Sequence, residues 1–171
     1  WSRIRIPHKE VYIVTPFIET SYLQSTSKFG KMIDGFLSEQ ADVNLVTQIP
    51  NISDIQIFKD FERRGATTWF KEKLHTKVYL FITNKEYQSS YAKRDDLGII
   101  GSANLTNRGV PFNGTDFNHE TCYTVPNEDI DEMRNAVLET MFGQSIYDLR
   151  RIEKILMSKN KNNELRRINN G

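Results

Sequence analysis

The stretch that decides the fold is LHTKVYLF, residues 74–81, read together with GSANLT, residues 101–106. In an extended strand alternate side chains point to opposite faces, so His75 and Lys77 would share one face of a sheet. The positions between them are mostly apolar and would face a core. The first stretch therefore predicts a half-buried strand that presents a histidine beside a lysine.

A second buried strand is predicted directly before GSANLT. Apolar residues at positions 97, 99 and 100 indicate a strand that runs through Gly101 and delivers Ser102 and Asn104 on one face. If the two strands are neighbours, an imidazole, an ammonium, a hydroxyl and an amide surround one point. A phosphate group fits there, because its oxygens accept several hydrogen bonds and its charge is opposite to that of lysine.

These residues resemble the signature of the phospholipase D superfamily, H-x-K-x4-D followed by G-S-x-N. The matching residues are His75, Lys77, Gly101, Ser102 and Asn104, and the chain has one copy of the pattern. In this it resembles the single-motif nuclease branch, which includes small bacterial endonucleases and metal-independent restriction enzymes that work as homodimers. The resemblance implies an α/β fold, a phospholipase D-like sandwich in which helices flank a mixed central β-sheet.

The sequence departs from the signature at the position of the motif aspartate, where Ile82 stands. In the family this aspartate mainly supports the site and does not react. Its absence therefore weakens the match without removing a reacting group.

The resemblance implies a role for each residue of the site. His75 would be the nucleophile and would form a covalent phosphohistidine intermediate that water later hydrolyses. Lys77 and Asn104 can neutralise the non-bridging oxygens from two strands, so no cofactor is implied. Glu120, on a strand predicted over residues 119–125, would accept a hydrogen bond from the far ring nitrogen of His75 and fix its tautomer.

Two further residues are candidates for binding substrate. Ser102 is favoured as a phosphate donor over a nucleophile, because no G-x-S-x-G elbow surrounds it. Arg108 is an even choice between a solvated loop charge and a phosphate contact. We expect no metal site, since the sequence has no carboxylate cluster at metal spacing, no H-x-x-x-H pair and a single cysteine, Cys122.

The leaving oxygen needs a proton donor, and the other histidines are His8 and His119. His119 alternates to the strand face opposite Glu120, and His8 lies in a polar stretch, so neither is well placed. In a two-fold dimer His75 of each subunit could meet across the axis, one as nucleophile and the other as acid. We therefore expect a homodimer with a shared active site.

The composition is that of an ordinary globular domain. The 171 residues are 38% hydrophobic and 26% charged, and 23 basic residues nearly cancel 22 acidic ones. Any nucleic-acid surface must therefore come from local clustering of charge. No apolar run approaches the roughly 18 residues of a membrane span, and a single cysteine fits a reducing, cytoplasmic setting.

Periodicity predicts the remaining elements of an α/β layered domain. Strands are expected at residues 11–18, 43–47 and 67–70, and helices from about residue 25 or 27 to 39, from a capping box at Ser53 and Gln56 to Gly65, and from Asn127 to Gly143. A last amphipathic segment carries Ile146, Leu149, Ile152 and Ile155. Cys122, Trp69 and Phe70 are expected in the core.

We expect residues 1–171 to form one catalytic domain with a helical, basic extension over residues 144–171. Its tail, residues 159–167, is interpreted as a solvated or frayed end in preference to a DNA-binding arm. The polar segment 83–96 interleaves basic and aromatic residues, but a solvated loop is favoured over a nucleic-acid contact. Because the chain begins at Trp1, we expect it to be a fragment of a longer protein.

Three functions remain open. A metal-independent endonuclease of the restriction or DNA-processing type, acting on DNA in preference to RNA, is favoured by the single motif and the polar basic loops. A phospholipid phosphodiesterase would require an apolar rim or a membrane-seeking helix, which the sequence does not offer. A catalytically silent dimer that binds nucleic acid is conceivable because of Ile82, but it would need neither His75 nor Glu120.

Overall fold

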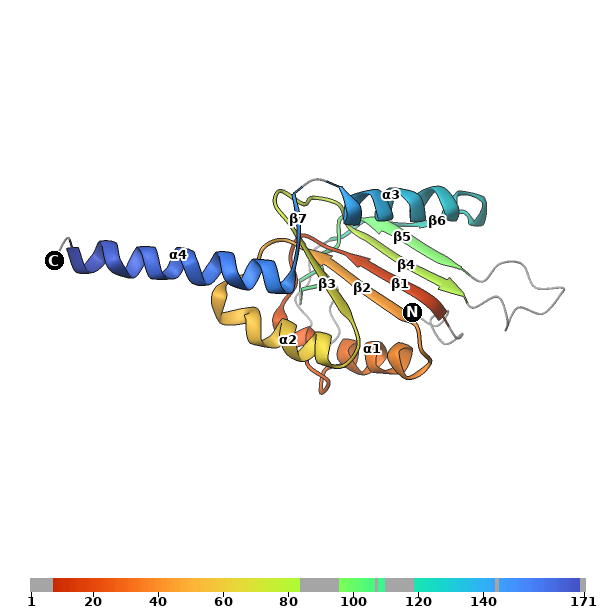
Figure 1. Cartoon of the computed structure of the whole chain (residues 1–171). Helices are drawn as coiled ribbons and strands as arrows, with labels where there is room; N and C mark the ends of the chain where they lie inside the picture. Colours follow the sequence, from red (N-terminus) through yellow and green to blue (C-terminus); the bar gives the residue numbers. More distant parts are fainter. Residues whose placement is uncertain (1–7, 84–95, 107, 110–118, 144, 170–171) are drawn as a thin grey trace.

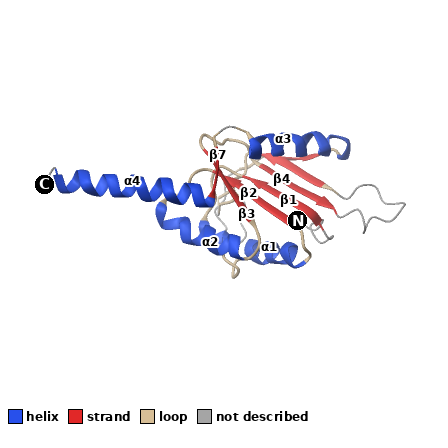
Figure 2. Ribbon diagram, in the orientation of Figure 1, coloured by secondary structure: helices blue, strands red, loops and turns tan. Residues whose placement is uncertain are grey.

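A mixed β-sheet runs through the centre of the molecule, with helices on both of its faces (Figures 1 and 2). The computed structural model describes residues 8–83, 96–106, 108–109, 119–143 and 145–169, without the side chains of residues 8 and 162–169. The strands are β1 (His8–Val14), β2 (Asp42–Thr47), β3 (Thr67–Lys71), β4 (Val78–Thr83), β5 (Leu97–Gly101), β6 (Cys122–Val125) and β7 (Ile146–Asp148). The helices are α1 (Lys28–Ser38), α2 (Ile55–Arg63), α3 (Ile130–Phe142) and α4 (Leu149–Asn169).

The strand order of the sheet is β6-β5-β4-β1-β2-β3-β7. β1 pairs in parallel with β2, which pairs in parallel with β3, whereas β1–β4, β4–β5, β5–β6 and β3–β7 are antiparallel. The carboxyl ends of β1, β2, β3 and β5 therefore lie at the same edge of the sheet as the amino ends of β4, β6 and β7. We call it the site edge, because both motif stretches lie on it. The predicted sandwich with a mixed central sheet is confirmed.

One face of the sheet, the closed face, is covered by α1, α2 and α4 (Figure 1). Its core contains five fully buried phenylalanines, Phe29, Phe58, Phe61, Phe70 and Phe81. Phe36 lies 5.8 Å from Phe81, and Phe58 lies edge-on to Phe70 at 5.1 Å, both measured between ring centroids. Such aromatic contacts add to the stabilisation that burial of the rings already gives.

On the other face, the α3 face, α3 is the only helix among the described residues. Ile130, Val137 and Met141 of this helix pack on the sheet residues Val14 and Leu80. Beside them an apolar groove of about 520 Å³ stays open between α3 and the sheet. Ile100 is 46% exposed and Tyr123, its partner in β6, is 68% exposed. Within the described part of the chain, α3 therefore leaves part of this face open.

A polar clamp fixes α3 to β1. Glu10 Oε2 accepts hydrogen bonds from Tyr12 Oη and from Arg134 Nε, both at 2.7 Å. Burial opposes ionisation of Glu10, but the bonds from Arg134 and Tyr12 outweigh it and hold the pKa of this carboxyl below its ordinary value. Burial and the bond to Glu10 raise the pKa of Tyr12. The clamp is therefore stable as a charged pair with a neutral phenol.

Most predicted elements are confirmed, but several of their ends differ. Strand β1 spans His8–Val14 and not residues 11–18, and β6 begins at Cys122 and not at residue 119. Ser27 caps α1 as predicted, because its Oγ accepts from Gly30 N at 2.7 Å. The capping box at Ser53 is wrong, since Ile52–Asp54 form a 3-10 helix and α2 begins only at Ile55. Ile146 belongs to strand β7, where it pairs with Lys71, and not to the last helix.

The predicted core positions have mixed outcomes. Phe70 is fully buried and Trp69 packs partly buried against the α3 face, so both predictions are confirmed. Cys122 is exposed, because β6 is the last strand of the sheet and none of the described helices covers it there. Most of the polar loop predicted at residues 83–96 lies outside the described residues, since these leave out 84–95. In the part of the chain that the structure describes, no helix could span a membrane.

Candidate active site

The segment with His75 and Lys77 lies on the site edge, directly before β4. The prediction of one strand over residues 74–81 is wrong for its first half, because β4 begins at Val78 and residues 74–77 form a loop. A long-range contact stabilises this loop, since Gln48 Nε2, directly after β2, donates to Leu74 O at 2.9 Å. Gly101 N still donates to Lys77 O at 3.3 Å, so the loop remains attached to β5.

The structure brings His75 and Lys77 together. The His75 side chain is exposed, and Lys77 is half-buried beside it. Lys77 Nζ donates to His75 O at 3.0 Å, which places the ammonium over the backbone that carries the imidazole. A positive charge and an accessible ring thus lie on one short loop, as an anionic substrate requires.

Ser102 and Glu120 form a second pair on the same edge. Ser102 Oγ donates to Glu120 Oε2, and Thr121 N donates to Ser102 Oγ at 3.0 Å. Ser102 N also donates to Thr121 O at 3.0 Å, so the start of β6 is fixed against the end of β5. The bond predicted between Glu120 and His75 stays a prediction, whereas the bond between Glu120 and Ser102 was not foreseen.

Gly101 makes this close approach possible. A Cβ atom at this position would lie 2.4 Å from Thr121 O and 2.8 Å from Cys122 Cα. Both are backbone atoms and cannot move without breaking the β5–β6 pairing. The glycine of G-S-x-N is therefore required by the packing of two strands that together present Ser102 and Glu120.

Asn104 is held between two anchored neighbours. Ala103 O accepts from Tyr79 Oη at 2.9 Å, and Leu105 N donates to Thr15 Oγ1 at 3.2 Å. Burial raises the pKa of Tyr79, so its hydroxyl remains a donor. Asn104 Oδ1 is buried and has no hydrogen-bond partner among the described residues. A buried acceptor without a donor costs roughly 1–3 kcal/mol, which a ligand or water at the site could recover.

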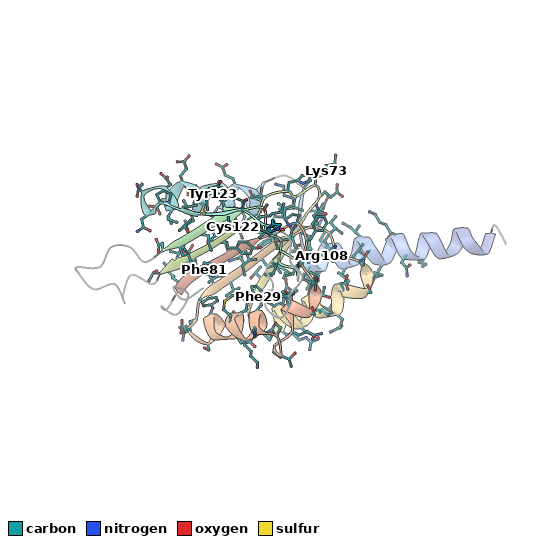
Figure 3. The ribbon with its side chains drawn as sticks, turned by 180° about the vertical axis from the view of Figure 1, so that it is seen from behind. Phe29, Lys73, Phe81, Arg108, Cys122 and Tyr123 are labelled. Carbon is teal, nitrogen blue, oxygen red and sulfur yellow. The ribbon has the colours of Figure 1, made fainter. Side chains whose placement is uncertain are left out.

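Arg108 follows on the rim of the site and is exposed. Figure 3 shows Arg108 and Lys73 toward the end of the sheet from which α4 extends. Gly109 N donates to Thr106 O at 3.1 Å, and a Cβ at Gly109 would lie 2.3 Å from Asn104 O. The turn that carries Arg108 is thus folded back on Asn104. Lys73, a second exposed cation, was missed by the sequence patterns because it precedes the motif.

Ile82 has a structural explanation. It lies near the carboxyl end of β4, opposite the site edge, is 6% exposed and belongs to the α3-face core with Tyr12 and Leu80. The side chain at the motif-aspartate position is therefore a core residue away from the site edge. Among the described residues, no group of three His, Cys, Asp or Glu side chains could hold a metal ion.

Comparisons with solved structures identify the fold. A polyphosphate kinase from Porphyromonas gingivalis is similar with a TM-score of 0.57 and 11% identity over 82% of this chain, which spans only 22% of that protein. A phospholipase D family member, Nuc from Salmonella typhimurium, is similar with a TM-score of 0.54 and 13% identity, over 86% of each chain. No protein-family model and no curated protein matches the sequence. The chain therefore has a phospholipase D-like fold, as its motif stretches predicted.

Proposed function

We propose that this phospholipase D-like chain is a metal-independent phosphodiesterase that cleaves nucleic acid, with DNA favoured over RNA, as an endonuclease of the restriction or DNA-processing type. One observation carries the proposal. The loop with His75 and Lys77, the Ser102–Asn104 segment and Glu120 lie on the same edge of the sheet, linked by backbone bonds between Gly101 and Lys77 and between Ser102 and Thr121.

In the first step an imidazole nitrogen of His75 attacks the phosphorus. The N–P bond forms, the P–O bond to the leaving nucleotide breaks, and a covalent phosphohistidine remains. Lys77 and Asn104 donate to the non-bridging oxygens, whose negative charge grows in the transition state. The exposure of His75 and the position of Lys77 Nζ at 3.0 Å from His75 O support this arrangement.

In the second step water attacks the phosphohistidine. The O–P bond forms and the N–P bond breaks, with the imidazole of His75 as the leaving group. The product is a phosphate monoester, which then dissociates from the site. Glu120 orients this chemistry by accepting from the His75 ring, and it also fixes the Ser102 side chain, whose hydroxyl donates to Glu120 Oε2. Arg108 and Lys73 attract the polyanion at the rim of the site.

A second subunit supplies the acid. His75 of the second subunit protonates the leaving oxygen and then takes a proton from the attacking water, so that protons balance over both steps. The exposed apolar side chains Ile100 and Tyr123, which face solvent beside each other on the α3 face, support a homodimer because an apolar patch of this kind is typical of an interface.

The decisive experiment is cleavage of labelled single- and double-stranded DNA in excess EDTA by wild type, His75→Ala and His119→Ala. His119 is the matched control, because it is also exposed at the site edge but is assigned no role. We expect wild type and His119→Ala to cut and His75→Ala to be inactive. Loss of activity in EDTA, or full activity of His75→Ala, would contradict the proposal.

The shared site is tested by mixing subunits. If both copies of His75 are required, a dimer of one wild-type and one His75→Ala subunit is inactive, and an equal mixture retains about a quarter active dimers. Activity per wild-type subunit then falls by about half. Activity that is independent of added His75→Ala protein would show that one subunit is sufficient.

A further inference from the structure

A second cavity lies at the site edge, where β1 and β2 end. It has a volume of about 250 Å³ and is lined by Pro16, Phe17, Thr47, Gln48, Asn51 and Phe58, among others. Because β1 and β2 are parallel, the chain leaves both strands at this edge, and the loops after them form the walls. Ligands of open α/β sheets bind in crevices of this kind.

The walls of this pocket are bonded directly to both motif segments. Gln48 Nε2 donates to the carbonyl of Leu74, the residue before His75, at 2.9 Å. Thr15 Oγ1 donates to Phe17 O at 3.0 Å and accepts at 3.2 Å from the amide of Leu105, the residue after Asn104. The pocket is thus linked to the residue before His75 by one hydrogen bond and to the residue after Asn104 by two, through Thr15.

The size and lining of the pocket define its ligand. A volume of about 250 Å³ is below the roughly 300–1,000 Å³ of sites for drug-sized molecules, so the pocket suits a group of about the size of one planar ring system. Phe17 lines the pocket and is 57% exposed, so part of its aromatic ring is accessible to a ligand. Asn51 and Asp54 add polar groups that can meet the edge of a heterocycle.

We propose that this pocket binds the nucleobase of a nucleotide adjacent to the scissile phosphate, with the base stacked on Phe17. The inference rests on the proposed function, since it places the base relative to the phosphate held by His75 and Lys77. Stacking on an aromatic side chain tolerates every base, so Phe17 contributes affinity and position without selecting a sequence. Asp54 repels phosphate, which favours the base over the backbone in this pocket.

The test measures binding without cleavage, in His75→Ala protein. The probes are a single-stranded DNA oligonucleotide that carries 2-aminopurine, a base whose fluorescence is quenched by stacking, and the same strand with an abasic residue in its place. Phe17→Ala is compared with Phe142→Ala, a phenylalanine that is 71% exposed but lies outside the pocket. Phe17→Leu removes the aromatic face while keeping apolar bulk, and thermal melting checks that each variant is folded.

We expect quenching on binding, its loss in Phe17→Ala and Phe17→Leu, and an affinity for the 2-aminopurine strand that is roughly 5- to 150-fold lower in Phe17→Ala. Phe142→Ala should behave as the parent, and the abasic strand should not distinguish the variants. Equal affinity of all folded variants for the 2-aminopurine strand would overturn the proposal, as would a Phe17→Ala effect confined to dimer formation. If 2-aminopurine is quenched on binding but the wild-type protein does not cleave DNA, base binding in this pocket is supported and the proposed hydrolysis is contradicted.

Discussion

The two faces of the sheet differ in how completely they are covered. Three helices and a set of buried phenylalanines fill the closed face. On the other face, α3 is the only helix that the structure describes, and a groove of about 520 Å³ remains beside it. Both faces use the same strands, so the difference arises from the helices. It indicates that the closed face supplies most of the stability, while the α3 face retains apolar surface for contact with another molecule.

The largest effect is expected from Phe81→Ala on the closed face. Phe81 is fully buried and lies against Phe36. Truncation should lower the free energy of unfolding by about 3–5 kcal/mol, because the surrounding helices cannot collapse into the cavity. Urea unfolding followed by circular dichroism measures this loss. A cost below about 1 kcal/mol would mean that the closed face is loosely packed.

A matched pair on β1 sharpens the comparison. Val11 faces the closed core and Val14 lines the groove, and both are fully buried. We expect Val11→Ala to cost about 2–3 kcal/mol and Val14→Ala about 1–2 kcal/mol, since each loses the same methyl groups but only Val11 leaves a closed cavity. Equal losses of unfolding free energy in the two variants would show that the open groove does not reduce the destabilisation caused by truncation.

Glu10→Gln tests the clamp that holds α3. At neutral pH we expect a loss of about 1 kcal/mol, because the charged bond to Arg134 is removed. The pKa of Glu10 is lowered from its ordinary value of 4.5, so its contribution is present above about pH 4.5 and is lost as the pH falls through the lowered pKa. Unfolding curves of wild type and variant should therefore converge in acid. A difference in unfolding free energy between wild type and Glu10→Gln that grows in acid would contradict the assigned role of Glu10.

The smallest effect on stability is expected at the exposed patch. Ile100→Ser and Tyr123→Ser should change the free energy of unfolding of the subunit by less than about 0.5 kcal/mol, because both side chains already contact water. If the patch is the dimer surface, the same variants should dissociate at higher protein concentration, as measured by sedimentation equilibrium. Unchanged association of both variants would place the interface elsewhere.

The elements with strong periodicity could be predicted from the sequence, together with their arrangement in an α/β sheet. The position of His75 relative to the strand could not, because its loop conformation depends on a bond from Gln48, a residue of another strand end. Strand β7 was also missed. A three-residue strand has no pattern of its own and exists here through its pairing with β3.

The candidate site was likewise predictable from the sequence only in part. That His75, Lys77, Ser102 and Asn104 lie at one sheet edge followed from two strands and a motif. The pairing of Ser102 with Glu120 did not, since it depends on the register of β5 against β6 and on the missing Cβ of Gly101. Thr15 and Tyr79, which anchor the neighbours of Asn104, carry no sequence signal because hydroxyl residues in strands are common.

The long helix α4 affects how the molecule moves through solution. Its 21 residues span about 30 Å at a rise of 1.5 Å per residue, and Figure 1 shows it extending away from the sheet. A compact chain of 171 residues has a radius of gyration of about 16 Å, so such an arm raises the frictional coefficient considerably. A monomer of 20.0 kDa will therefore elute from a sizing column ahead of compact standards of its mass. Its association state must be read from mass, by light scattering or sedimentation equilibrium, and not from elution volume.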